Sequence, residues 1–316
     1  MKILVTGGAG FIGSNLVPHL AGVGHDVVVL DNLSVGQDTP NFPSAVKFRR
    51  GDFLDDSTLR ECLAGVDVVV HLAAMSGVMD SIADPARCFA DNTEGTFRLL
   101  EAARHAKVGQ FVNASTGGAI LGEVTPPISE AMAPSPLSPY GASKLATEGL
   151  CSAYSASYGL PCVSLRFSNI YGPNSAHKKS VVAAYIKRVF DDQPLIVYGD
   201  GTQRRDYLFV GDLVRGIAEA IGQRVHGTFQ LGSGKPTALL DLIRALETVV
   251  GRKIAVEHEP ARTGEVHSTW CDIAKAREAF DYAAPTAVAE GLRATWDWFA
   301  AHQAIWRRQK ILSAAD

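Results

Sequence analysis

The stretch that most constrains the fold is "KILVTGGAGFIGSNL", residues 2–16 of a chain of 316 residues. A run typical of a β-strand, residues 2–7, leads into glycines at positions 7, 8, 10 and 13, and a helix-like segment follows at 14–22. Glycine reaches backbone angles that are costly for other residues, so the pattern predicts a tight turn between strand and helix. A helix that begins there offers free N–H groups and a positive dipole end, which predicts a pyrophosphate-binding site.

Asp31 ends the second predicted strand, about 20 residues after the glycine turn. A carboxylate at this point accepts hydrogen bonds from an adenosine ribose and repels a 2′-phosphate. No lysine or arginine follows in residues 32–38, so the sequence predicts NAD as the cofactor rather than NADP. Asp52 and Phe53, after the third predicted strand, either flank the adenine or lie in a surface turn. His71 lies within an apolar strand and is interpreted as a core histidine rather than a base.

Apolar strand-like runs alternate with helix-like stretches through the first half of the chain. Strands are expected at 2–7, 26–31, 46–53, 66–74, 110–116 and 161–167, and helices at 14–22, 57–64, 88–106 and 140–158. The strands lack polar alternation, as expected when both faces of a parallel sheet are buried. The fold class is therefore α/β, with a Rossmann-type doubly wound parallel sheet.

After residue 168 the alternation of strand-like and helix-like segments becomes less regular. Helices are expected at 181–191, 208–221, 239–250 and 285–302, with short strands at 195–198 and 254–258. We predict an NAD-binding domain at 1–168, to which 200–222 returns. Residues 169–316 form mainly a smaller, intertwined lobe that binds the substrate.

Tyr140 and Lys144 are four residues apart at the start of the predicted helix 140–158, so they share one helix face. A nearby ammonium favours the phenolate, which allows the tyrosine to act as a base near neutral pH. A hydroxyl for the substrate oxygen is expected from Ser115 or Thr116 at the end of the strand 110–116, and Thr116 is preferred.

Composition excludes several classes of protein. The net charge is −3 and no long basic stretch occurs, so nucleic acid is not expected as a partner. No run of about 18 apolar residues is present, so no membrane span is expected. The five cysteines are scattered without metal-ligand spacing, which predicts reduced thiols, no metal site and a cytoplasmic protein.

Taken together, the motifs resemble the extended short-chain dehydrogenase/reductase family, in particular nucleotide-sugar 4-epimerases of the UDP-galactose 4-epimerase type. The resemblance covers nearly the whole chain and includes "TGGAGFIGSNL", "DNLS", "SPYGASKLATE", "YGDGTQRRDYLFVGDL" and "RTGEVHSTWCDIAKA". It implies a resident NAD, a UDP-sugar substrate, and a homodimer formed through the helices 88–106 and 140–158.

The resemblance also implies a role for each matched residue. Tyr140 is the base, Lys144 holds the nicotinamide ribose, and Arg205 and Arg262 clamp the diphosphate. The implied cofactor-binding residues are Gly7, Gly10, Phe11, Ile12, Gly13, Asp31, Asn32, Ser34, Asp52, Phe53, Leu72, Ala73, Ala74, Asn92, Tyr140 and Lys144. The implied substrate-binding residues are Thr116, Asn169, His177, Lys179, Ser180, Val181, Tyr198, Arg205, Arg262 and Glu265.

The segment after the loop hydroxyl favours simple epimerisation. Related 4,6-dehydratases carry an Asp-Glu pair there and decarboxylases a glutamate, whereas this chain has Gly117-Gly118-Ala119. The expected reaction is oxidation of a UDP-hexose at C4 and return of the hydride to the opposite face. The alternatives are a 4,6-dehydratase, decarboxylase or ketoreductase of the same family, or a non-catalytic NAD-sensing protein. A gapless alignment places Gly117 at the hydroxyl position, and Leu121 replaces a common tyrosine, which predicts a wider pocket.

The substrate's sugar is left open by the sequence. "NSAHKKSVV", residues 174–182, lies where the family's sugar-binding loop is expected. Its His177, Lys178 and Lys179 either recognise the carboxylate of a uronic acid, contact phosphate or face solvent. UDP-glucuronate/galacturonate therefore stands beside UDP-glucose/galactose and the N-acetyl forms.

Overall fold

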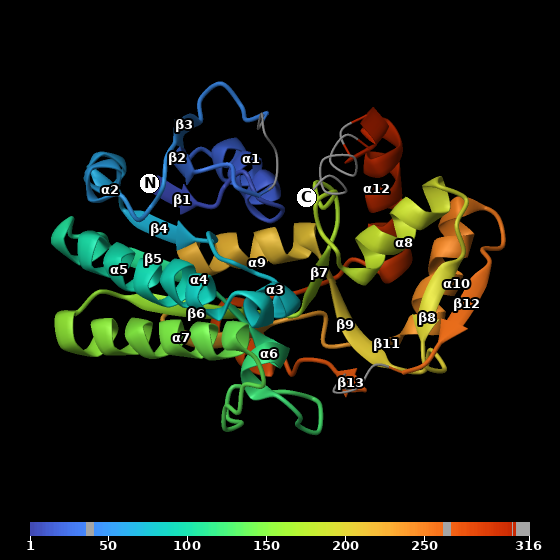
Figure 1. Ribbon diagram of the computed structural model, residues 1–316. Coiled ribbons are helices and arrows are strands. Elements are labelled where there is room, and N and C mark those ends of the chain that lie inside the picture. Colours follow the sequence, from blue (N-terminus) through green and yellow to red (C-terminus); the bar gives the residue numbers. More distant parts are fainter. Residues whose placement is uncertain (36–40, 262–266, 305, 308–316) are drawn as a thin grey trace.

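The centre of the fold is a sheet of seven parallel strands in the order β10-β6-β5-β4-β1-β2-β3 (Figure 1). The computed structural model describes residues 1–35, 41–261, 267–304 and 306–307. The strands are β1 (Lys2–Thr6), β2 (Asp26–Asp31), β3 (Lys47–Arg50), β4 (Val68–His71), β5 (Gln110–Thr116), β6 (Cys162–Phe167) and β10 (Gly227–Leu231). All residues of β4 and β6 are buried, as expected for parallel strands covered on both faces. The predicted doubly wound α/β fold is confirmed.

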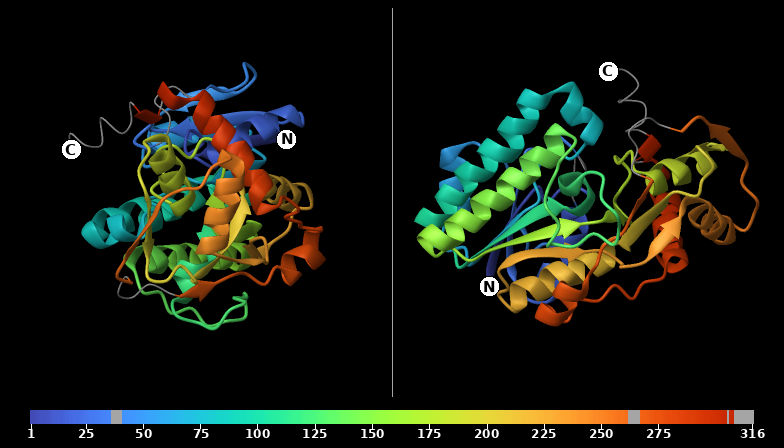
Figure 2. Two further views of the ribbon diagram at one scale, coloured as in Figure 1. Left: turned by 90° about the vertical axis from the view of Figure 1, so that its right-hand side faces the viewer. Right: turned by 90° about the horizontal axis from the view of Figure 1, so that it is seen from below.

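Helices cover the two faces of this sheet (Figure 2, right). One core contains apolar side chains of α1 (Gly13–Gly22) and α9 (Val210–Gly222). The core on the other face contains side chains of α2 (Asp56–Leu63), α5 (Gly95–His105) and α7 (Pro139–Tyr158). The glycine turn and the start of α7 therefore come to the same end of the sheet, where the parallel strands finish.

A third core lies in the part of the molecule on the right of Figure 1. It is built from α8 (Val181–Phe190), α10 (Leu239–Val250) and α12 (Val288–Ala301), with the parallel pair β8 (Leu195–Tyr198) and β12 (Val256–Glu259). A small sheet joins this core to the main one, and its strands are β7 (Asn169–Tyr171), β9 (Arg204–Phe209), β11 (Pro236–Ala238) and β13 (Ser268–Thr269).

The start of α7 is fixed by its own sequence. The Ser138 Oγ accepts a hydrogen bond from the Gly141 N–H at 3.1 Å, and Pro139 occupies the first turn, where its missing N–H costs nothing. The helix ends at Gly159, which has a φ of +67°. Because the helix begins at Pro139, Tyr140 lies in the first turn of α7, directly after the loop that precedes the helix.

Several predicted elements differ from the observed ones. The helix expected at 88–106 is divided into α4 (Pro85–Cys88), a π-helical segment η1 (Phe89–Glu94) and α5. The helix expected at 208–221 begins at Val210, because Leu208 and Phe209 pair with β7 as the end of β9. Residues 117–121, expected in a loop, form α6 (Gly117–Leu121).

The chain's return to the main sheet extends beyond residues 200–222. β10, for which no strand was predicted, pairs in parallel with β6 and forms one edge of the sheet. α11 (Ala274–Phe280) then packs on the same side as α9 through Phe280. The five cysteines are buried free thiols. In the described ranges no helix has both the length and the apolar composition that crossing a bilayer requires.

Candidate active site

The glycine turn lies between β1 and α1 and rests on the end of β4. Gly7 has a φ of +70°, and a Cβ there would lie 2.5 Å from the backbone nitrogen of Ala73. A Cβ on Gly13 would lie 2.4 Å from the Cα of Gly8. Within the described residues no side chain caps the start of α1, but the Ser14 N–H already donates to the Gly10 carbonyl at 2.9 Å, so an anion would have to bind N–H groups that precede Ser14. The turn therefore fits a dinucleotide pyrophosphate.

Asp31 lies at the end of β2, beside the turn. Its Oδ2 accepts the Ala9 N–H at 2.9 Å, and its Oδ1 accepts the Leu33 N–H at 2.8 Å. Burial raises the pKa of Asp31, while these two backbone hydrogen bonds act in the opposite direction. Each carboxylate oxygen accepts more than one hydrogen bond, so Asp31 retains the capacity to bind ribose hydroxyls.

Asn32, Ser34 and Asp52 form a polar group next to Asp31. The Asn32 Nδ2 donates to the Asp52 Oδ2 at 3.1 Å, and the Ser34 N–H donates to the Asn32 Oδ1 at 3.0 Å. These bonds join the ends of β2 and β3. Three of the predicted adenosine-binding residues are thus neighbours in space.

His71 is a hydrogen-bonded core residue, as the sequence analysis predicts. Its ring nitrogens pair with the hydroxyls of Thr6 at 2.7 Å and Thr96 at 3.0 Å. Burial lowers the pKa of His71 to about 3, and the charge of Lys144 acts in the same direction. Phe53 packs edge-on against this ring, with 5.4 Å between centroids.

Asn92 links the segment after β4 to α7. Residues 72–74 are half-buried there, and Met75 follows them. The Asn92 Oδ1 accepts the Met75 N–H at 2.8 Å, and its Nδ2 donates to the Met75 carbonyl and the Ser143 Oγ, each at 3.0 Å. The π-helical turn of η1 carries this residue, as is frequent at functional sites.

Tyr140 and Lys144 lie one helical turn apart on α7. The Lys144 Nζ is buried and donates to the Ala114 carbonyl at the end of β5, at 2.9 Å. Burial raises the pKa of Tyr140 to about 12 and lowers the pKa of Lys144 to about 8. At neutral pH the tyrosine is a phenol and the lysine is mostly charged, so a phenolate needs further positive charge near the ring.

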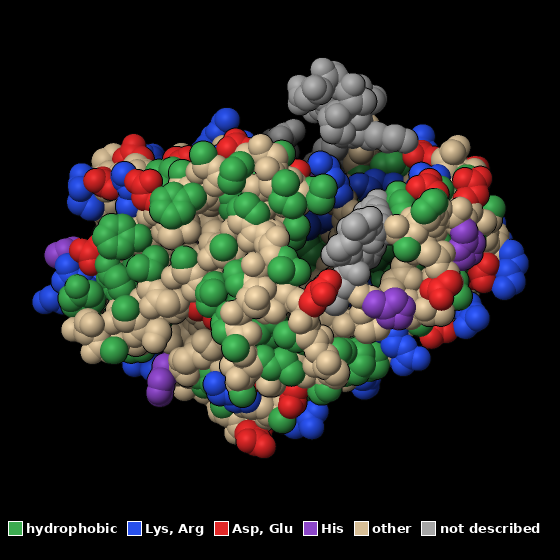
Figure 3. Space-filling model, turned by 60° about the horizontal axis from the view of Figure 1, so that its bottom comes forward, with side chains coloured by type: hydrophobic (Ala, Val, Ile, Leu, Met, Phe, Trp, Pro, Cys, Tyr) green, Lys and Arg blue, Asp and Glu red, His purple; other side chains and the backbone are tan. Residues whose placement is uncertain are grey.

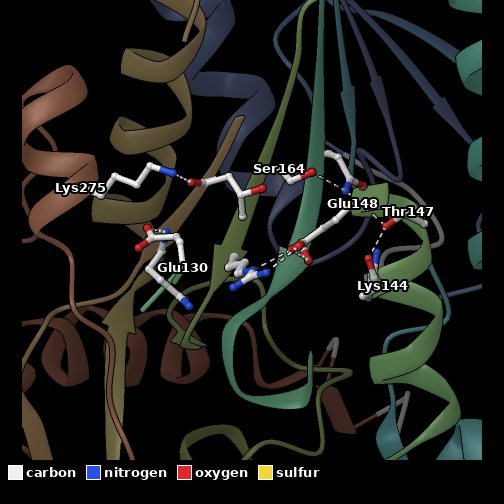
Figure 4. A network of polar contacts seen from close by, with 11 residues as sticks. Glu130, Lys144, Thr147, Glu148, Ser164 and Lys275 are labelled. Carbon is white, nitrogen blue, oxygen red and sulfur yellow. Dashed lines mark hydrogen bonds and ion pairs between the residues drawn. The ribbon is translucent and has the colours of Figure 1, made fainter. Parts of the chain in front are cut away.

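The hydroxyls of Ser115 and Thr116 have different surroundings. The Ser115 Oγ donates to the Glu148 Oε1 at 2.6 Å, and the same carboxylate binds the Arg166 guanidinium at 2.9 and 2.8 Å (Figure 4). Neighbouring residues on a strand point to opposite faces, so the Thr116 side chain points away from Glu148. The occupied Ser115 hydroxyl favours Thr116 as the group that meets a substrate.

A cleft of about 660 Å³ opens between the glycine turn, the start of α7 and α8. The sequence-predicted residues that line it are Phe11, Ile12, Ser115, Thr116, Tyr140, Asn169, Lys179, Ser180, Val181, Tyr198 and Arg205. The structure therefore brings the predicted cofactor turn, the tyrosine and the predicted sugar loop to one cavity.

Two sequence-based expectations concern residues that do not line this cleft. His177 does not line the cleft, and burial lowers its pKa to about 4, with the charges of Lys178 and Lys187 acting in the same direction. Leu121 is fully buried in the core and is not among the residues that line the cleft, so the effect of the missing tyrosine on the pocket stays a prediction. Arg262 and Glu265 lie outside the described residues.

Sequence reasoning missed part of the lining. The residues concerned include Ser76, Tyr185, Arg188, Gln203 and Tyr207, and Lys178 was considered but not selected. A signal was present, because residues 181, 184, 185 and 188 have the i, i+3, i+4, i+7 spacing of a single helix face. That spacing indicates a shared face without indicating what the face contacts.

The fold, the glycine turn with Asp31 and the Tyr140–Lys144 pair define a dinucleotide-dependent enzyme of the Rossmann class. The chain belongs to the NAD-dependent epimerase/dehydratase family, whose model matches residues 3–232. This confirms the resemblance found in the sequence and agrees with the predicted cofactor, NAD.

Relatives similar to this chain include epimerases and dehydratases. A UDP-glucose 4-epimerase of Mycolicibacterium smegmatis is 37% identical, over 95% of this chain and 98% of its own. A dTDP-glucose 4,6-dehydratase of Streptomyces niveus is 34% identical, over 98% and 96%. The family thus includes relatives of two activities at similar identity.

Two solved structures show the same fold. The UDP-glucose 4-epimerase of Thermotoga maritima with UDP-glucose superposes with a TM-score of 0.91 at 35% identity, covering 96% of this chain and 100% of the other. The UDP-glucuronic acid 4-epimerase of Bacillus cereus, in complex with UDP-glucuronic acid and NAD, gives 0.87 at 35% identity, covering 95% and 99%.

Proposed function

We propose that this chain catalyses the NAD-dependent epimerisation of a UDP-hexose at C4. The observation that carries the proposal is a single cleft lined by the glycine turn, Thr116 and Tyr140, with Lys144 one turn behind the tyrosine. No Asp or Glu occurs among the described lining residues. Dehydration and decarboxylation in this family use an added acid or base, so its absence favours epimerisation.

Each residue of the site has a separate role in the proposed reaction. Tyr140 takes the proton from the sugar O4 and later returns it, while the Thr116 hydroxyl hydrogen-bonds the same oxygen. The charge of Lys144 stabilises the phenolate and its ammonium holds the nicotinamide ribose. When bound, NAD supplies the reversible oxidation at C4. The glycine turn and Asp31 would hold its pyrophosphate and its adenosine ribose.

The proposal also covers the two domains, the substrate contacts, the location and the oligomeric state of the protein. Residues 1–168 with the segments that return to the main sheet would bind NAD, and most of 169–316 would bind the UDP-sugar. Asn169, Tyr198 and Arg205 are offered as contacts of the nucleotide and its diphosphate, because they line the cleft beyond Tyr140. We also propose a cytoplasmic homodimer, and the exposed Phe89, Phe97 and Tyr158 on η1, α5 and α7 support the dimer.

The test is to incubate the purified protein with UDP-glucose, UDP-galactose or UDP-glucuronate without added NAD, and to separate the products by chromatography. Formation of the C4 epimer without accumulation of NADH is the expected result. Release of water or carbon dioxide from the sugar, or one NADH formed per sugar, would identify a dehydratase, a decarboxylase or a dehydrogenase instead.

A further inference from the structure

The cleft has an excess of positive charge. Among the described residues that line it, the charged ones are Lys178, Lys179, Arg188 and Arg205, and the carboxylate near the lysines, that of Asp80, is not part of the lining. A nucleotide diphosphate carries about two negative charges, which Arg205 and Arg188 suffice to balance. The two lysines therefore provide charge that a neutral hexose does not use.

The lysines and Arg188 lie at opposite ends of α8. The lysines immediately precede the helix, which begins at Val181, and Arg188 follows two turns later. At 1.5 Å per residue, the start of α8 is about 10 Å from Arg188 along the axis. The Arg188 Nε hydrogen-bonds the Pro194 carbonyl at that far end. Arg188 thus lies about two turns from the lysines along α8, while Lys187 reaches back from the same turn to donate to the Lys178 carbonyl at 3.0 Å.

Lys178 reaches the wall of the cleft that carries the tyrosine. Its Nζ donates to the Ser76 Oγ at 3.2 Å, across a separation of 102 residues. Ser76 follows Met75, which is held by Asn92, and precedes α3 (Val78–Ala83). The Ser81 Oγ of α3 accepts the Tyr140 N–H at 3.1 Å. Lys178 is therefore tied to the same short segment that positions Tyr140.

The two lysines differ in their surroundings. The Lys179 side chain is 89% exposed and lies 3.8 Å from Asp80, so solvent and a carboxylate already surround its charge. Lys178 is half-buried: burial lowers its pKa while the charge of Asp80 acts in the opposite direction, and the ammonium retains donors beyond the one bound to Ser76. A partly buried ammonium is stabilised when an anion approaches it in a dry site.

On the basis of the proposed C4 epimerisation, we propose that Lys178 is a specificity-determining residue that selects a UDP-sugar with a carboxylate at C6, a UDP-hexuronate. C6 is attached to C5, which is the ring neighbour of the reacting C4. A sugar whose O4 meets Tyr140 therefore carries its C6 group into the immediate surroundings of the tyrosine, where Lys178 is anchored. A hydroxymethyl group at C6 would offer this ammonium no counter-charge in addition to that of Asp80.

The test compares kcat/KM for UDP-glucuronate and UDP-glucose in the wild type and in Lys178→Met, which keeps the length of the side chain without its charge. We expect the wild type to prefer UDP-glucuronate at least about tenfold. In Lys178→Met, kcat/KM for UDP-glucuronate should fall about 10- to 100-fold, the range of a hydrogen bond between charged groups, and the UDP-glucose value should change less than about threefold.

Three further variants sharpen the result. Lys178→Arg keeps the charge and should retain the preference for UDP-glucuronate. Lys253→Met removes a lysine that is 90% exposed and pairs with Glu247 away from the cleft, and should behave as wild type. If Lys179→Met rather than Lys178→Met loses the preference, the assignment to Lys178 is wrong.

The outcomes separate this inference from the proposed function. Epimerisation of UDP-glucose with no preference for UDP-glucuronate would refute the role of Lys178 and leave C4 epimerisation standing. An equal fall for both substrates in Lys178→Met, with an unchanged melting temperature, would show that the lysine acts on the shared UDP part. Conversion of neither sugar would overturn both proposals.

Discussion

The proposed role of Tyr140 as a base requires that its surroundings change when the cofactor and the substrate bind. Burial raises its pKa to about 12, so the hydroxyl is protonated at neutral pH in the chain by itself. Tyr140→Phe removes the hydroxyl and keeps the ring that fills the wall of the cleft. We expect turnover to fall by about 10²- to 10⁴-fold, the usual contribution of a general base, with NAD still bound. Product formation and the NAD content of the purified variant are the measurements. Activity near the wild-type level would remove Tyr140 from the mechanism.

The buried charge of Lys144 lowers the stability of the folded chain. Its pKa falls from 10.5 to about 8 through burial, so the unfolded chain binds more protons than the folded one between pH 8 and 10.5. The free energy of unfolding therefore rises with pH through this window. Below it, the buried ammonium destabilises the fold by about 3 kcal/mol, since one pKa unit corresponds to about 1.4 kcal/mol.

Lys144→Met should separate these two effects. We expect a protein that is inactive and yet at least as stable as the wild type at pH 7, because the buried charge is gone. Thermal unfolding of the NAD-free proteins from pH 7 to 10.5 provides the measurement. The wild type should gain stability across that range and the variant should gain less, whereas parallel curves would show that Lys144 titrates normally.

Among single residues, the sequence pointed to those candidate site residues that lie close to one another along the chain or at the end of a predicted strand. The glycine turn, Asp31 and the Tyr140–Lys144 pair each lie within a few residues or at a strand end, where geometry follows from the element itself. The choice between Ser115 and Thr116 was open because strand alternation says only that they face opposite sides. What distinguishes the two hydroxyls is the hydrogen bond from Ser115 to Glu148, a residue of α7 that is distant in the sequence.

Between elements, the buried ion pair of Glu148 and Arg166 joins α7 to β6. The two side chains are 7% and 5% exposed, and the Arg166 Nη1 has no hydrogen-bond partner among the described residues. Glu148→Gln would leave the guanidinium charge buried without its counter-charge. We expect the free energy of unfolding to fall by about 3–5 kcal/mol, as chemical denaturation would measure.

The matched control for this variant is Glu94→Gln. Glu94 forms a shorter but exposed pair with Arg98, at 2.7 Å, with both side chains more than two-fifths exposed. Exposed pairs contribute about 0–1 kcal/mol, so this variant should unfold almost as the wild type does. Equal losses in the two variants would show that burial does not set the strength of the α7–β6 pair.

Helices and strands were predicted well where the signal lies within the element's own sequence. Strands β1, β2, β5 and β6 are marked by short runs rich in apolar residues, and helix α7 begins at its Ser138 cap. β10 was missed because a five-residue edge strand with the sequence GTFQL carries little signal without its partner β6. The boundary at Val210 was missed for a similar reason, since Leu208 and Phe209 continue an apolar run whose strand pairing is not local.

For the molecule as a whole, one group of exposed apolar side chains lies on η1, α5 and α7. Hydrophobic groups gather over the α5 and α7 region at the left of Figure 3, and Phe89 and Phe97 are 60% and 44% exposed. Clusters of this kind mark interaction surfaces. Phe97→Glu should convert the proposed dimer into a monomer, which light scattering coupled to size-exclusion chromatography would detect. An unchanged mass would place the interface elsewhere, and a wild-type monomer would exclude the dimer.

β10 follows its partner β6 only after a long stretch of chain, and this affects how the sheet folds during synthesis. β6 is complete at Phe167, yet the strand that covers its outer edge begins only at Gly227, after residues 168–226. A nascent chain that has just released β6 from the ribosome therefore presents an apolar strand with an open hydrogen-bonding edge, a template for misplaced pairing. The seven-stranded sheet can therefore be completed only after translation of residues 227–231.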